Sequence, residues 1–138
     1  MSEKDILKNE GALLSSINTC PIYRLLGMEA MEARNGRARV KLPFKEDLTH
    51  PGKIVHGGAI ASVADSALAL ALLSLTFPKN FVTTVEMKLN YLAPVDRGEM
   101  IAEGRVVKKG KTFSLVEVEV TSDEGKLIAK GLATFYMI

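Results

Sequence analysis

One segment of the chain, HGGAIASVADSALALALLSL at residues 56–75, limits what the protein can fold into. As a helix it would be about 30 Å long and apolar on all sides, so it must be buried in a protein core or in a membrane. Asp65 near its middle and the many small Ala and Ser residues disfavour a membrane span. We therefore expect the core helix of a soluble domain, with no membrane partner.

Strand patterns surround this helix. Before it, Asn35-Gly36 is a preferred two-residue hairpin turn within MEAMEARNGRARVKL. After Pro78, alternating apolar residues predict strands over 84–91, 100–107, 113–121 and 127–137. Helices are expected over Glu3 to Ile17 and at 21–26. The prediction is an α+β fold in which a curved antiparallel sheet wraps one long buried helix, as a single domain over 1–138 with residues 1–26 as an N-terminal helical segment.

Charge and cysteine content exclude several classes of partner. The net charge is +2, and Lys and Arg are scattered apart from one cluster at 108–111, so no basic face predicts nucleic-acid binding. The charged N-terminus lacks the apolar stretch of a signal peptide. The single Cys20 excludes an intrachain disulfide and fits a reducing compartment. We expect a cytoplasmic protein.

Asp65 is the first candidate catalytic residue, because burying an unpaired carboxylate costs several kcal/mol, in order of magnitude. A structural Asp, hydrogen-bonded to backbone amides or to Ser62 or Ser66, is the alternative.

Gly57 and Gly58 begin the helix, where amides lack intrahelical partners and the macrodipole is positive. A ligand can approach this backbone closely, and a carbonyl oxygen on the Gly57 N–H would be polarised as in an oxyanion hole. A tight loop-to-helix turn is the alternative there.

The separation of these two residues has a consequence for assembly. Asp65 lies eight residues after Gly57, about 12 Å further along an ideal helix. A site built from both must therefore take them from two chains. A second subunit would also cover the side of the helix that one sheet leaves open. We expect a homo-oligomer, dimer or tetramer, with its sites at the subunit interface.

His50 and His56 are the only histidines, and their spacing is not a usual metal-ligand pattern, so no metal is expected. His56 is expected to fix the loop by hydrogen bonding. His50 can donate to a leaving group near neutral pH.

The segment KKGKT at 108–112 predicts a hairpin turn and not a P-loop. Within it, Lys109, Gly110 and Lys111 either contact substrate phosphates or are simply solvated.

Two segments, HPGKIVHGGAIASVADSALALAL and TTVEMKLNYLAPVDRGEMIAEGRVVKKGKTFSLVEVEV, resemble the hotdog-fold acyl-CoA thioesterases of the phenylacetate-degradation (PaaI-like) type. The resemblance runs from about Gly27 to the C-terminus. It is carried by HGG, an Asp eight residues after the first Gly, a strand that ends in Tyr-x-x-Pro, and a meander with Gly turns. It implies the hotdog fold and hydrolysis of an acyl-CoA to a free acid and coenzyme A, with no separate cofactor.

The resemblance also implies roles for single residues. The family's helix Asp, nucleophile or general base, matches Asp65, and the Gly that supplies the polarising amide matches Gly57. His56 and Gly58 complete the HGG motif as expected substrate contacts. A strand hydroxyl that orients water matches Thr84, although strict alternation places Thr84 on the polar face of its strand.

Some positions depart from the family or leave choices open. His50 stands where Asn is usual, and Lys53 where Gly is usual. A hotdog hydratase or dehydratase is disfavoured, because Leu70 stands where those enzymes commonly carry His. A non-catalytic acyl-CoA binding or sensing module is the alternative function. The acyl group is not identified, and Leu68 and Leu72 are candidates to line its pocket.

Overall fold

The computed structural model describes residues 2–138. These residues form α1 (Glu3–Asn18), α2 (Pro21–Leu26), β1 (Glu29–Arg34), β2 (Arg37–Pro43), the 3-10 helix η1 (Glu46–Leu48), α3 (Gly57–Thr76), β3 (Val82–Tyr91), β4 (Glu99–Lys109), β5 (Phe113–Ser122) and β6 (Leu127–Met137). Each helix and strand predicted from the sequence is present. The short η1 helix was not predicted.

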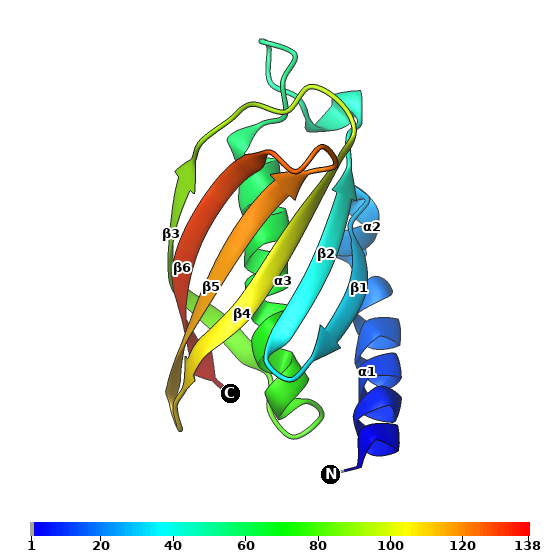
Figure 1. The fold of residues 1–138 in the computed structure, drawn as a ribbon, viewed down its shortest axis with the longest axis vertical. Helices are drawn as coiled ribbons and strands as arrows, with labels where there is room; N and C mark the ends of the chain where they lie inside the picture. Colours follow the sequence, from blue (N-terminus) through cyan, green and yellow to red (C-terminus); the bar gives the residue numbers. More distant parts are fainter. Residues whose placement is uncertain (1) are drawn as a thin grey trace.

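The six strands form one curved antiparallel sheet that wraps around α3 (Figure 1). The strand order is β1-β2-β4-β5-β6-β3, so β1 and β3 are the edges. Helix α1 packs beside β1, whereas β3 pairs only with β6 among residues 2–138. This is the predicted α+β hotdog fold, and it leaves the outer edge of β3 open.

The β1–β2 hairpin turns at Asn35-Gly36, as predicted. Asn35 has φ 53° and Gly36 has φ 77°, and a type I′ turn requires positive φ at both central residues. The Gly36 N–H also donates to Ser74 Oγ at 2.9 Å. The turn is thereby tied to the last part of α3.

One side of α3 packs tightly on the sheet. A Cβ added at Gly104 would lie 2.3 Å from the Ala67 carbonyl oxygen, so only glycine lets β4 approach the helix this closely. Leu68 and Leu72 are fully buried on α3. The expectation that they line an open acyl pocket is therefore wrong. The half-buried positions of the helix are all small or polar: Gly57, Ala61, Ser62, Asp65, Ser66, Ala69 and Ser74.

Within residues 2–138, α3 alone is long and apolar enough to cross a membrane, with a mean hydropathy of 1.8, but 56% of its most apolar stretch is buried inside the fold. Core helices of soluble domains share this property.

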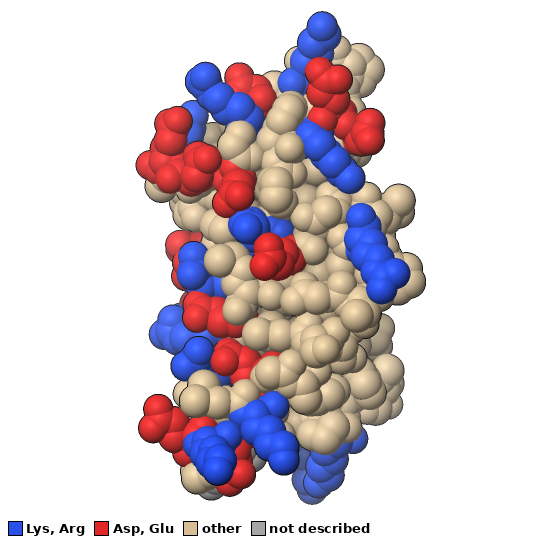
Figure 2. Space-filling model, turned by 90° about the vertical axis from the view of Figure 1, so that its right-hand side faces the viewer, with Lys and Arg blue, Asp and Glu red and all other residues tan. Residues whose placement is uncertain are grey.

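Figure 2 shows that charged side chains of both signs gather along the left margin of the view, which is the outer face of the sheet, and that a broad uncharged area lies beside them.

Candidate active site

Asp65 is held by a side chain from the edge strand. Thr84 Oγ1 on β3 donates to Asp65 Oδ1 at 2.7 Å, and the carboxylate is half-buried. Neither neighbouring serine bonds to it: Ser62 Oγ donates to the Gly58 carbonyl at 2.8 Å, and Ser66 Oγ lies 3.6 Å from Met28 Sδ. The carboxylate therefore remains open on the side away from Thr84.

Thr84 reaches Asp65 because β3 contains a β-bulge. The register shifts between Thr84, which pairs with Phe135, and Glu86, which pairs with Thr134, so Val85 is the extra residue. Phe135 is buried, and cross-strand partners share a face, so Thr84 lies on the face that packs on α3. Strict alternation gave the wrong face for Thr84 and also for Val85, which is 54% exposed.

The first amide of α3 is free to bind a ligand. His56 is the N-cap residue, and its Nδ1 accepts from the Gly58 N–H at 2.7 Å. The next two helical amides, those of Ala59 and Ile60, both donate to the His56 carbonyl. Within residues 2–138 no acceptor contacts the Gly57 N–H. Gly57 thus offers a donor at the positive end of the helix, whereas the Gly58 amide is occupied by His56.

Gly57 and His50 line one hollow of about 390 Å³ with Tyr91. The other lining residues are apolar: Ile54, Val55, Ile60, Leu92, Ala93 and Pro94. Tyr91 OH donates to the Gly57 carbonyl at 3.0 Å, and His50 Nδ1 accepts from the Gly52 N–H at 2.9 Å. Since Nδ1 accepts, the neutral His50 ring carries its proton on Nε2 and can donate from there.

Gly57 and Asp65 do not share one site within a chain. The helix is continuous from Gly57 to Thr76, so they lie about 12 Å apart along its axis. Both flank β3, because Tyr91 contacts Gly57 and Thr84 contacts Asp65. The exposed apolar side chains at or next to this strand are Phe81, Val85, Tyr91 and Leu92.

Tyr23 on α2 was missed by the sequence analysis. Burial raises the pKa of Tyr23 to about 12; the hydrogen bond with the Ser66 side chain opposes this shift, and electrostatic interactions with Cys20 and Asp65 add to it. The phenol therefore stays neutral beside Asp65. No sequence pattern marks this contact, since it depends on how α2 packs against α3.

Lys109 is the last residue of β4, and Gly110 and Lys111 lie in the β4–β5 turn, so the predicted hairpin turn is present. Figure 1 shows this turn at the end of the sheet where α3 finishes, far from the end where Gly57 begins the helix. The structure thus does not bring these residues to Gly57 of the same chain.

Within the described residues 2–138, no group of three His, Cys, Asp or Glu side chains is arranged to hold a metal ion.

Comparisons with known proteins place the chain in a family. Residues 52–129 match the family model of the thioesterase superfamily. A protein of Saccharolobus solfataricus with the name "Putative esterase" is 37% identical over 117 residues, which cover 85% of this chain and 83% of that protein. The 1,4-dihydroxy-2-naphthoyl-CoA hydrolase of Listeria monocytogenes is 26% identical, with 78% of this chain and 87% of that protein covered.

A solved structure supports the fold. The PaaI protein of the E. coli phenylacetic acid degradation operon superposes with a TM-score of 0.87, covering 99% of this chain and 96% of that one. Its sequence identity is 20%, so this likeness concerns the fold alone.

Proposed function

The chain belongs to the thioesterase superfamily, and from this membership and the site geometry we propose that it is an acyl-CoA thioesterase of the PaaI-like type. It hydrolyses an acyl-CoA to a free acid and coenzyme A. The observation that carries the proposal is the combination of a free amide at Gly57 with a carboxylate at Asp65 that Thr84 holds in place. The name of the Listeria relative, a CoA-thioester hydrolase, supports the substrate class.

The reaction requires charge stabilisation at the thioester carbonyl. The Gly57 N–H donates to the carbonyl oxygen and stabilises the oxyanion that forms there. Asp65 of the facing subunit either attacks the carbonyl carbon, forming an anhydride that water then hydrolyses, or removes a proton from the attacking water. Either way the carbon–sulfur bond breaks and the thiolate takes up a proton. In this proposal His50, which lines the same hollow as Gly57, supplies that proton from Nε2 or holds the substrate.

A second copy of the chain completes the site in this proposal. The open edge of β3 and its exposed apolar side chains favour edge-to-edge pairing of two subunits. Such pairing draws Gly57 and Asp65 from two chains. The proposal needs no cofactor beyond the coenzyme A of the substrate. It also places the protein in the cytoplasm, which the free thiol of Cys20 fits.

The test is the release of free thiol from a panel of acyl-CoAs, measured with a thiol reagent on the purified protein. We expect steady turnover that Asp65→Asn lowers by about 100-fold or more. Asp47→Asn is the matched control, because Asp47 is exposed on η1 and has no side-chain partner among residues 2–138. Equal turnover in the Asp65 and Asp47 variants would refute the mechanism. Acyl-CoA binding without thiol release would instead support a non-catalytic binding module.

A further inference from the structure

The edge strand β3 carries two opposite charges on its outer face. Met87 pairs with the buried Ala133, so it faces α3, and its neighbours Glu86 and Lys88 face outward. Glu86 Oε1 accepts a hydrogen bond from Thr134 Oγ1 at 2.9 Å. Neither charge has an oppositely charged partner within residues 2–138. Both therefore remain available to a second chain.

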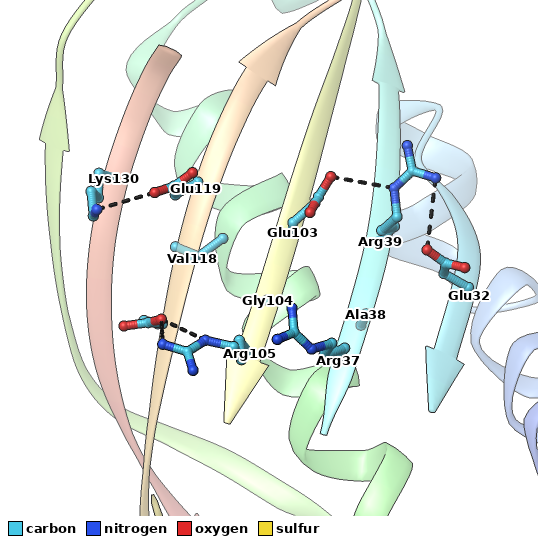
Figure 3. Close-up of a pocket in the computed structure, with 11 residues that line it drawn as sticks. Glu32, Arg37, Ala38, Arg39, Glu103, Gly104, Arg105, Val118, Glu119 and Lys130 are labelled. Atoms are coloured by element: carbon cyan, nitrogen blue, oxygen red, sulfur yellow. Dashed lines mark hydrogen bonds and ion pairs between the residues drawn. The ribbon is translucent and has the colours of Figure 1, made fainter. Parts of the chain in front are cut away.

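Several other charges on this face pair across neighbouring strands. Figure 3 shows a hollow of about 360 Å³ in the middle of the face, and the ion pairs around it are Arg39–Glu32, Arg39–Glu103 and Lys130–Glu119. Each of these pairs joins two adjacent strands of the sheet. Strand β3 has a neighbour on one side only, because it is an edge. Its two charges are therefore expected to find partners on the open side.

The backbone of β3 limits how a second copy can pair with its open edge. In the register of β3 and β6, Leu92 stands opposite Ile128, and its N–H donates to the Ile128 carbonyl at 2.8 Å. Hydrogen-bonded residues alternate along an antiparallel strand, so Glu86 and Lys88 direct their backbone groups to β6. Met87 then directs its N–H and C=O to the open edge. Two copies of β3 must align these outward-directed residues with each other.

The charges distinguish between the alignments that remain. If Glu86 or Lys88 lay on the two-fold axis, it would face its own copy, and like charges directly opposite each other are unfavourable. If Met87 lies on the axis, each Glu86 faces Lys88 of the partner subunit. Such facing residues form a non-hydrogen-bonded pair with Cα atoms about 4.5 Å apart, which brings the side chains close together. The alignment centred on Met87 is therefore favoured.

The same alignment assembles the proposed site. Tyr91 contacts Gly57 and Thr84 contacts Asp65, and these contacts lie toward opposite ends of β3. Met87 stands about midway between Thr84 and Tyr91 in the strand, so a two-fold axis at Met87 exchanges the two ends. Gly57 of one chain then lies on the same side of the contact as Asp65 of the partner subunit.

We propose that two ion pairs between Glu86 and Lys88 of the partner subunit set the register of the dimer; this inference rests on the shared site of the proposed function. A slip of two residues would shift one subunit along the other by about 7 Å and separate Gly57 from the partner subunit's Asp65. Glu86 and Lys88 are thus positioning residues, because they act on the site through the alignment of β3.

Charge reversal tests the ion pairs. Glu86→Lys and Lys88→Glu each place like charges opposite each other, so we expect each to raise the dimer dissociation constant about tenfold or more, and less at about 1 M salt. The double reversal, Glu86→Lys with Lys88→Glu, restores opposite charges and should restore the wild-type constant. Glu124→Lys and Lys126→Glu are the matched controls, an exposed acid and base with the same spacing in the β5–β6 turn.

Sedimentation equilibrium gives these constants. Single reversals with no more effect than the controls would overturn the inference, and so would a double reversal as weak as the single ones. Neither Glu86 nor Lys88 touches the substrate, so the thiol release of each variant should follow its fraction of dimer.

Cysteine crosslinks read the register directly, in a Cys20→Ser background. Glu86→Cys chains mixed with Lys88→Cys chains should form a disulfide between subunits on mild oxidation, because facing Cα atoms about 4.5 Å apart are within bridging range. Either variant alone should stay uncrosslinked, since its two cysteines lie diagonally, about 7–8 Å apart. A crosslink in one variant alone would place that residue on the axis and overturn the inference, as would the lack of one in the mixture.

The two proposals fail in different ways. A crosslink in the mixture alone, without thiol release from any acyl-CoA by the wild type, would refute the proposed function and leave the register intact. Thiol release by the wild type, with a crosslink in either variant alone, would refute the register and leave the proposed function intact.

Discussion

Thr84 Oγ1 donates to Asp65 Oδ1 at 2.7 Å, although the two residues stand 19 positions apart on different elements. The bond leaves Asp65 Oδ2 without a protein partner among residues 2–138. One oxygen thus fixes the orientation of the carboxylate, and the other is available for attack or for proton removal. A carboxylate held in this way loses less conformational freedom when substrate binds.

Thr84→Val tests the value of this bond. Valine is similar in shape but cannot donate, so we expect kcat to fall about tenfold or more while KM changes little. Thr84→Ser keeps the hydroxyl and should retain most of the activity. Steady-state kinetics of both variants give the answer. Equal kcat for Thr84→Val and Thr84→Ser would show that the hydroxyl has no part in turnover.

Gly57→Pro removes the proposed oxyanion donor with little other change. Gly57 is the first residue of α3, where proline is tolerated, and His56 has φ −61° and ψ 138°, which suits a residue before proline. We expect kcat to fall about 100-fold, as when one oxyanion donor is lost. Gly57→Ala is the control, because its Cβ makes the same 3.4 Å contact with the Tyr91 ring but keeps the N–H. Similar losses in both variants would point to crowding and not to the amide.

Mixing two inactive variants tests the shared site. Chains with Gly57→Pro and chains with Asp65→Asn are each expected to be about 100-fold less active than the wild type. When they are unfolded together and refolded, hybrid dimers contain one site with both intact residues, because each residue comes from a different chain. We expect thiol release to return in the mixture. If the mixture stays as inactive as its components, the two residues act within one chain.

The raised pKa of Tyr23 predicts that the free energy of unfolding falls at alkaline pH. Its pKa is raised from 10.0 to about 12 in the folded protein, so the unfolded chain releases the phenolic proton first as the pH rises. The contribution of Tyr23 is complete below pH 10 and is lost by about pH 12, a change of about 2 to 3 kcal/mol. Urea unfolding of wild type and Tyr23→Phe across this range isolates it. Parallel pH curves for the two proteins would contradict the prediction.

Glu10 is expected to attach α1 to β1. This carboxylate is only 9% exposed, and its Oε2 accepts from the Ala33 N–H at 2.9 Å and from Arg34 Nε at 3.1 Å. Glu10→Ala should lower the free energy of unfolding by about 1–3 kcal/mol, because the Ala33 amide is left without its acceptor. Lys8→Ala, at an exposed position on the same helix, is the control. A Glu10 variant as stable as this control would exclude the bond as the attachment of α1.

Much of the fold could be predicted because it depends on local patterns. Asn35-Gly36 specifies a turn through its own backbone preference, and alternating apolar residues specify the strands. Features that depend on packing between elements were missed. Tyr23 meets α3 only through the placement of α2, and the Gly58 amide is occupied only because the His56 ring folds back on it.

The candidate site was predicted in part for the same reason. Asp65 stands out as a lone charge in an apolar run, and Gly57 stands out at the start of that run. The face on which Thr84 lies could not be read from alternation, since nothing in VTTVEMKLNY marks which residue forms the bulge. Leu68 and Leu72 stand as candidates for a substrate pocket in the sequence, because a helix that is apolar on all sides does not reveal which side meets the sheet; both are fully buried.

Val85 makes β3 one residue longer than its partner strand requires at that point. Deleting this single codon would restore regular pairing and leave Thr84 opposite Phe135, on the side of the strand that faces α3. The bulge therefore accommodates one extra residue while the threonine keeps its side of the strand. A homologue with one residue fewer at this point could keep the contact between hydroxyl and carboxylate.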